Sequence, residues 1–123
     1  MREVVIVEAV RTPIGMRDGS LSGLSPTRLA ATVLHELIAV TGIDPALIED
    51  VIFGCVTPLG EQGANIARLA VLQAGLPVEV PAVTLNRMCG SSQQAIHFAA
   101  QAIAAGDMDV VIAGGIEMMS RVL

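Results

Sequence analysis

The hydrophobic positions follow two different patterns along the chain, and their order predicts the fold class. Four short apolar runs contain many β-branched residues and few polar ones, which is typical of strands buried on both faces. They cover residues 3–10, 51–57, 80–85 and 109–113. Between these runs, apolar residues recur every three or four positions, which predicts amphipathic helices. The helices cover residues 26–41, 65–74 and 89–105, with one short helical turn at 44–50.

Residues with known capping preferences mark both ends of the first predicted helix. Ser25 is a favoured N-cap, Pro26 suits the first helical position, and Gly42 suits the left-handed residue that often follows a helix. Strands that alternate with helices predict a layered α/β fold with a largely parallel sheet. The sequence contains no repeat and no internal linker, so we expect residues 1–123 to form one structural unit.

Composition adds an expectation about burial and excludes several classes of partner. Hydrophobic residues make up 53% of the chain and charged residues 15%, so we expect apolar surface to remain for a partner subunit or for further polypeptide. The net charge of -5 and the absence of Trp and Tyr argue against nucleic-acid binding. No apolar run approaches the roughly 18–20 residues of a membrane span. Since nothing near Met1 has the pattern of a signal peptide, we expect a cytoplasmic protein.

The most informative position is Cys89, which lies where the third strand meets the third helix. The unpaired N–H groups of a first helical turn stabilise negative charge, so a thiolate is favoured there. The same donors suit an oxyanion that forms when a carbonyl is attacked. A buried structural role for Cys89 is equally open at this point, because most free cysteines pack as small hydrophobic residues. For Cys55, which lies inside a strand, the structural role is favoured, and the spacing of the two cysteines predicts no metal site.

Three segments of the sequence resemble the thiolase family, which comprises acyl-CoA acetyltransferases and 3-ketoacyl-CoA thiolases. The first is VEAVRTPIGMRDGSLSGL, residues 7–24. The second is LNRMCGSSQQAIHFAAQAIAAGDMDVVIAGG, residues 85–115. The third is GGIEMMSRV, residues 114–122. The resemblance extends over essentially the whole chain, and it implies a thiolase-like layered fold with a mixed, largely parallel sheet flanked by helices.

The resemblance also implies a reaction and a role for Cys89. Cys89 is then the nucleophile that becomes acylated in a ping-pong reaction, with its backbone N–H in an oxyanion hole. The reaction is thiolysis of a 3-ketoacyl-CoA or formation of acetoacetyl-CoA, within fatty acid metabolism. Coenzyme A is a substrate, and no cofactor is implied. Gly90, Glu117 and Met118 are candidates for residues that support the nucleophile or line its pocket, although core packing is favoured for Met118.

The family's length implies that residues 1–123 are an incomplete N-terminal domain. The loop domain, the second half, the activating histidine and a second cysteine are expected downstream, so we expect the isolated chain to be inactive. A homodimer or homotetramer is expected for the full-length enzyme, with an interface near residues 80–85. The order Cys-Gly-Ser-Ser-Gln that begins at Cys89 replaces the Cys-Ala-Ser-Gly or Cys-Ser-Ser-Gly of many relatives. It is similar to degradative thiolases with larger substrates, cyclic ones included.

Two other functions compete with a catalytic thiolase segment. A thiolase-like module that dimerises or binds a partner without catalysis has the same sequence features. Ketoacyl-carrier-protein synthases share the fold and the cysteine nucleophile. The opening Arg11-Thr12-Pro13 and the segment from Gly114 to Ser120 are similar to thiolases rather than to those synthases.

Overall fold

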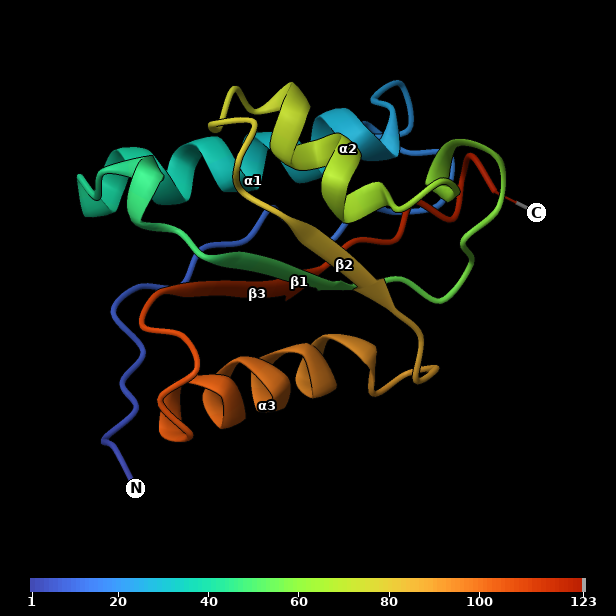
Figure 1. The fold of residues 1–123 in the computed structure, drawn as a ribbon. Coiled ribbons are helices and arrows are strands. Elements are labelled where there is room, and N and C mark those ends of the chain that lie inside the picture. Colours follow the sequence, from blue (N-terminus) through green and yellow to red (C-terminus); the bar gives the residue numbers. More distant parts are fainter. Residues whose placement is uncertain (123) are drawn as a thin grey trace.

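Three parallel strands form the middle layer of an α/β structure, which a computed structural model describes for residues 1–122 (Figure 1). The strands are β1 (Asp50–Gly54), β2 (Ala82–Leu85) and β3 (Val111–Gly115), in the order β2-β1-β3. The α-helices are α1 (Pro26–Thr41), α2 (Ile66–Gln73) and α3 (Ser91–Ala104), and two 3-10 turns cover Pro45–Leu47 and Gly60–Gln62. The α/β class predicted from the sequence is confirmed, and within the described residues all strand pairs are parallel.

The central strand β1 is buried on both faces, as its continuous apolar run predicts. Val51 and Phe53 belong to a core that also contains Leu34 of α1 and Val71 of α2. Ile52 belongs to a second, smaller core on the face that α3 covers. This division follows from strand geometry, because successive side chains point to opposite faces of a sheet. Figure 1 shows the resulting layers, with α1 and α2 on one side of the sheet and α3 on the other.

The first helix has the caps that the sequence predicts. The Ser25 hydroxyl accepts a hydrogen bond from the backbone N–H of Arg28 at 3.1 Å. Gly42 adopts a left-handed φ of 65° and donates its N–H to the carbonyl of Ile38 at 2.9 Å. With 16 residues α1 is the longest described helix, and no helix within residues 1–122 has the length and apolar character needed to cross a membrane.

The path of the chain brings three loops to one edge of the sheet. The connection through α2 runs from β1 outward to β2, whereas the connection through α3 returns over β1 to β3. Since such crossovers are right-handed, opposite directions of travel place the two helices on opposite faces. All three strands are parallel, so their carboxyl ends lie at the same edge, where open α/β sheets bind ligands.

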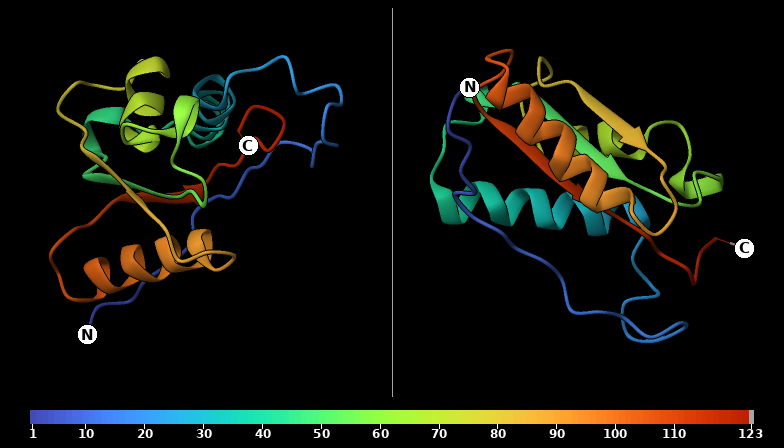
Figure 2. Two further views of the ribbon diagram at one scale, coloured as in Figure 1. Left: turned by 90° about the vertical axis from the view of Figure 1, so that its right-hand side faces the viewer. Right: turned by 90° about the horizontal axis from the view of Figure 1, so that it is seen from below.

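The predicted strand at residues 3–10 is wrong in this structure. The segment is extended and strongly exposed, with 77% of Ile6 and 81% of Val7 accessible. Figure 2 shows it running past the layers without joining the sheet. Its apolar pattern has strand character, but a strand also needs a neighbouring backbone, and no other described residue provides one. Nearby, the chain is attached through the Arg2 amide, which donates to the carbonyl of Ala104, and through the ion pair of Arg2 with Asp109.

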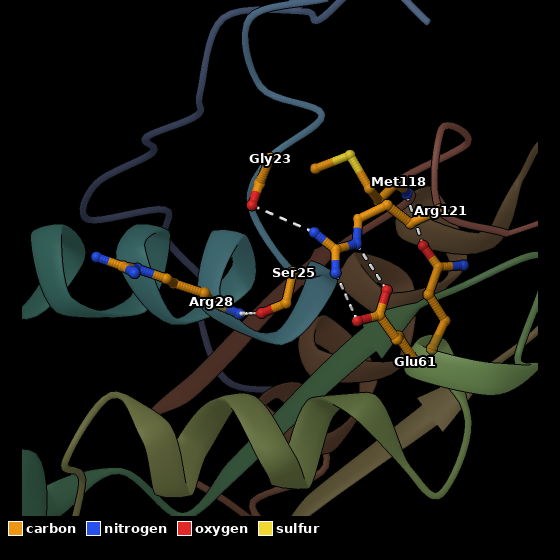
Figure 3. A network of polar contacts seen from close by, with 7 residues as sticks. Gly23, Ser25, Arg28, Glu61, Met118 and Arg121 are labelled. Carbon is orange, nitrogen blue, oxygen red and sulfur yellow. Dashed lines mark hydrogen bonds and ion pairs between the residues drawn. The ribbon is translucent and has the colours of Figure 1, made fainter. Parts of the chain in front are cut away.

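The segment after β3 is held by polar contacts to two distant parts of the chain (Figure 3). Arg121 forms a two-pronged ion pair with Glu61, with N–O distances of 2.7 and 2.8 Å, and also donates to the carbonyl of Gly23. Ser120 accepts a hydrogen bond from the amide of Asp18 at 2.6 Å. These contacts fix the segment that carries Glu117 and Met118 against the loops beside it.

Candidate active site

The turn between β2 and α3 is braced from within by a buried serine. The Ser91 hydroxyl donates to the carbonyl of Met88 at 2.5 Å and accepts from the amide of Arg87 at 2.9 Å. Asn86 adds two further contacts, accepting from the Met88 amide and donating to the Val56 carbonyl. Met88 has a left-handed φ of 49°, which side chains other than glycine rarely adopt. Such unfavourable backbone geometry persists only where surrounding contacts enforce it.

Cys89 lies on this turn, just before the helix. Helix α3 begins at Ser91 with Gly90 as its N-cap, so it starts two residues later than residue 89, where the sequence predicted it. The left-handed Met88 and the hydrogen bond from the Gly90 amide to the carbonyl of Arg87 keep this part of the chain out of the helix. The Cys89 thiol is consequently exposed, whereas Cys55 is buried.

An open cleft of about 290 Å³ lies beside Cys89 at the carboxyl edge of the sheet. Its walls come from the loop after β1, the turn before α3 and the loop after β3. The lining residues are Gly54, Cys55, Val56, Met88, Cys89, Ser91, Ser92, Gly115, Ile116 and Glu117. The structure therefore brings Cys89 and Glu117, two residues singled out from the sequence, to the same cleft.

Two glycines let the start of α3 lie directly against the strand ends. A Cβ atom at Gly54 would lie 2.5 Å from both the carbonyl carbon and the Cβ of Ser91. A Cβ atom at Gly115 would lie 3.0 Å from the Cβ of Ser92. A Cβ atom does not approach the carbon atoms of a distant residue to 2.5 Å, so any side chain at position 54 would push the helix away. The location of Cys89 thus depends on Gly54 in the neighbouring strand, because glycine has no side chain.

Behind the cleft, Gln62 connects the two loops that form its back wall. Its amide nitrogen lies 2.8 Å from Oε2 of Glu117 and 2.9 Å from the carbonyl of Thr57, and its oxygen accepts from the Met118 amide at 2.6 Å. The second oxygen of Glu117 accepts from the amide of Val56 at 2.8 Å. Gln62 is fully buried, and these contacts satisfy its polar atoms.

The environment of Cys55 opposes ionisation. Burial raises the pKa of the Cys55 thiol above its usual value, and the negative charge of Glu117 raises this pKa further. The Cys55 sulfur lies 3.4 Å from the amide nitrogen of Gln62. The sequence-based preference for a structural Cys55 agrees with this burial. Within the described residues, no three His, Cys, Asp or Glu side chains gather in a way that would hold a metal ion.

Comparison with known proteins identifies the family of this chain. Residues 4–123 match the N-terminal domain of thiolases. The chain belongs to the thiolase family. Within this family it is 52% identical over 122 residues to a steroid 3-ketoacyl-CoA thiolase of Mycobacterium tuberculosis. It is also 51% identical over 122 residues to a β-ketoadipyl-CoA thiolase of Escherichia coli, and 49% identical over 120 residues to an acetyl-CoA acetyltransferase of Pseudomonas aeruginosa.

These alignments cover nearly all of this chain but a minor part of each relative. They include 99%, 98% and 98% of the chain, respectively, and 30% of each relative. The chain therefore spans about 30% of the length of these curated thiolases. The thiolase assignment of the sequence analysis is confirmed, and it removes the carrier-protein synthases from consideration.

The structure also places Gly90 and Met118, the other two candidate residues of this thiolase segment. Gly90 caps α3 and does not line the cleft. Met118 is 6% exposed and contributes its backbone amide to Gln62, so it lies behind the cleft, in keeping with the core packing favoured from the sequence. Sequence reasoning missed Ser91, Gln62 and Gly54. A serine two residues after the cysteine and a glycine at a strand end were visible signals, but nothing in the pattern around Gln62 indicated that two distant loops meet there.

Proposed function

We propose that this chain supplies the nucleophile for acyl transfer between acyl-CoA thioesters, with Cys89 as the acylated residue. The observation that carries the proposal is the exposed thiol on a braced strand-to-helix turn, open to a cleft at the carboxyl edge of a parallel sheet. Membership of the thiolase family supports it. The amides of Gly90 and Ser91 already donate to the carbonyls of Arg87 and Met88, which leaves the Cys89 amide as the proposed oxyanion donor.

In the proposed thiolysis, the Cys89 sulfur attacks the 3-keto carbonyl of a 3-ketoacyl-CoA. The bond between C2 and C3 breaks, its electron pair takes up a proton to give acetyl-CoA, and the remaining acyl group stays on Cys89 as a thioester. The thiol of free coenzyme A then attacks this thioester, forms the shortened acyl-CoA and releases the cysteine. Covalent catalysis divides one difficult step into two easier ones, and both pass through an oxyanion that backbone donors stabilise. Acetoacetyl-CoA formation is the reverse direction with acetyl groups.

We further propose that residues 1–123 correspond to the N-terminal thiolase domain and do not turn over substrate alone. The relatives are more than three times as long as the matched region, and among the described residues no histidine lines this cleft. The proposed partners are acyl-CoA, coenzyme A and a second copy of the chain in a homodimer or homotetramer, with β2 at the interface. β2 is an edge strand with Val83 45% exposed, which supports its use in subunit contacts.

The first experiment compares alkylation of Cys89 with that of a merely accessible thiol. The chain and a Cys89→Ala/Ser20→Cys variant, which carries its exposed thiol on a distant loop, are treated with limiting iodoacetamide at pH 6 and mapped by peptide mass spectrometry. Ser20 is exposed, so the variant reports accessibility alone. We expect Cys89 to react about ten times faster than the introduced thiol, because thiolates and not thiols react. Equal rates would support a non-catalytic binding module instead.

A further inference from the structure

The carboxylate of Glu117 is the only acidic group that faces the cleft of Cys89 within residues 1–122. The other ionisable group on the cleft walls is the buried thiol of Cys55, after β1. In the turn itself, Arg87 is the nearest charged residue along the chain, and the first turn of α3 carries no charge. The charge balance around Cys89 therefore depends on where the Glu117 carboxylate points.

Both oxygens of that carboxylate are held by donors on the back wall. The Val56 amide donates to Oε1, and the side chain of Gln62 donates to Oε2, each at 2.8 Å. Gln62 is itself fixed, because it is fully buried and also bound to Thr57 and Met118. Two donors from two directions restrain the carboxylate from turning toward the Cys89 thiol.

The restraint matters because a second negative charge opposes the formation of a thiolate. Like charges a few ångströms apart disfavour each other's ionised form, and more strongly where water is partly excluded. Without the side chain of Gln62, Glu117 would keep the Val56 amide and the thiol of Cys55 as donors, both on the loop after β1, and its Oε2 would lose the donor that holds it there. The carboxylate would then be freer to rotate into the cleft. A more negative cleft would oppose the negative charge that a nucleophilic Cys89 sulfur must carry.

We infer that Gln62 is a positioning residue that holds the Glu117 carboxylate against the loop after β1, so that the thiolate of Cys89 forms without a negative charge beside it. The inference rests on the proposed role of Cys89 as the nucleophile. Gln62 touches neither Cys89 nor the cleft space in front of it, and it acts through Glu117.

The test follows the rate of Cys89 alkylation by iodoacetamide as a function of pH in four forms of the 123-residue chain. They are the unchanged chain, Gln62→Met, Glu117→Gln, and the two changes combined. Methionine has nearly the volume of glutamine but donates no hydrogen bond. We expect Gln62→Met to raise the pH of half-maximal alkylation by about half a unit or more. Glu117→Gln alone should change this midpoint pH little. When Glu117→Gln is added to Gln62→Met, the midpoint pH should return to that of the unchanged chain.

The return of the midpoint in the combined variant distinguishes positioning from simple damage, since loss of packing is not repaired by removing a charge elsewhere. An unshifted midpoint in Gln62→Met, or a shift that Glu117→Gln does not reverse, would overturn the inference. If Gln62→Met does not fold by circular dichroism, the Glu117→Gln chain still decides the matter: a downward shift of about half a unit there would mean that the charge already acts on Cys89. Slow alkylation of Cys89 in the unchanged chain would instead contradict the proposed function.

Discussion

At the scale of single residues, the two cysteines line one cleft in opposite environments. Cys89 is exposed on a turn whose backbone is forced into place by Ser91 and Asn86. Cys55 is 1% exposed and lies beside the carboxylate of Glu117 and the amide of Gln62. The same side chain is thus exposed at one position, whereas at the other its surroundings raise the pKa of the thiol. The difference comes from their neighbours and not from the residue type.

The raised pKa of Cys55 makes stability depend on pH in a predictable direction. The thiol keeps its proton in the folded chain at a pH where the unfolded chain, with an ordinary value of 9.0, has already lost it. The folded state then binds more protons than the unfolded state, so the free energy of unfolding decreases as the pH rises through and above 9.0. Urea unfolding at a series of pH values should show this decrease in the unchanged chain.

The matched variant is Cys55→Ala, which removes the titrating group and keeps Cys89. Its free energy of unfolding should be lower at neutral pH, because a buried side chain has been shortened. It should, however, lose less stability than the unchanged chain as the pH rises past 9.0. Parallel pH profiles for the two proteins would show that burial of the Cys55 thiol does not govern the alkaline decrease.

At the scale of elements, the distance between α3 and the sheet decides where Cys89 lies. The helix begins on top of Gly54 and Gly115, where strand ends without side chains allow close approach. Its Ala95 and Ala99 continue this close packing against Ile52 in the smaller core. On the opposite face, larger side chains such as Leu34 and Phe53 separate the layers. Small residues thus allow α3 to lie close to one face of the sheet, whereas larger side chains hold the helices on the other face farther away.

Replacing Gly54 with alanine tests this packing. The added Cβ would lie 2.5 Å from Ser91, so α3 must shift or the strand must bend. We expect a loss of about 1–3 kcal/mol in the free energy of unfolding, as for other overpacked sites. Alkylation of Cys89 should also slow, because the brace from Ser91 is disturbed. Gly23→Ala is the control, since a Cβ there meets nothing within 4 Å and should leave both measurements nearly unchanged.

At the scale of the whole molecule, the sheet is covered on both faces, while apolar surface remains beside it. The exposed residues of the N-terminal segment include Val5, Ile6 and Val7, with 64%, 77% and 81% of their surface accessible. A continuous apolar stretch of this kind is normally buried against another chain or another part of the same one. The 53% hydrophobic composition had already indicated such surplus apolar surface.

We therefore predict that the 123-residue chain self-associates in solution. Light scattering should show an average mass that increases with protein concentration, and Ile6→Lys should shift it toward the monomer by placing a charge in the segment. Leu47→Lys is the control, because Leu47 is 55% exposed but lies on a separate 3-10 turn. A monodisperse monomer of the unchanged chain at all concentrations would contradict the prediction, and equal effects of both variants would place the contact elsewhere.

The sequence predicted much of the local structure because its signals act over a few residues. Ser25, Pro26 and Gly42 set the ends of α1 through hydrogen bonds to residues three or four positions away. The apolar runs around β1, β2 and β3 predicted the strands to within a few residues. The segment at residues 3–10 has the same kind of run, yet it forms no strand, because pairing depends on a neighbour that the local pattern does not specify.

The sequence by itself determined the α/β class and the thiolase family, and it singled out Cys89 as the proposed nucleophile, since each inference depends on neighbouring residues or on linear motifs. Only the tertiary structure decided that Glu117 and Cys89 share a cleft, that Gln62 connects its two loops, and that Gly54 supports the helix start. These arrangements join residues that are far apart along the chain. Their distances follow from how the strands are ordered and how closely the layers pack, and no local sequence pattern encodes them.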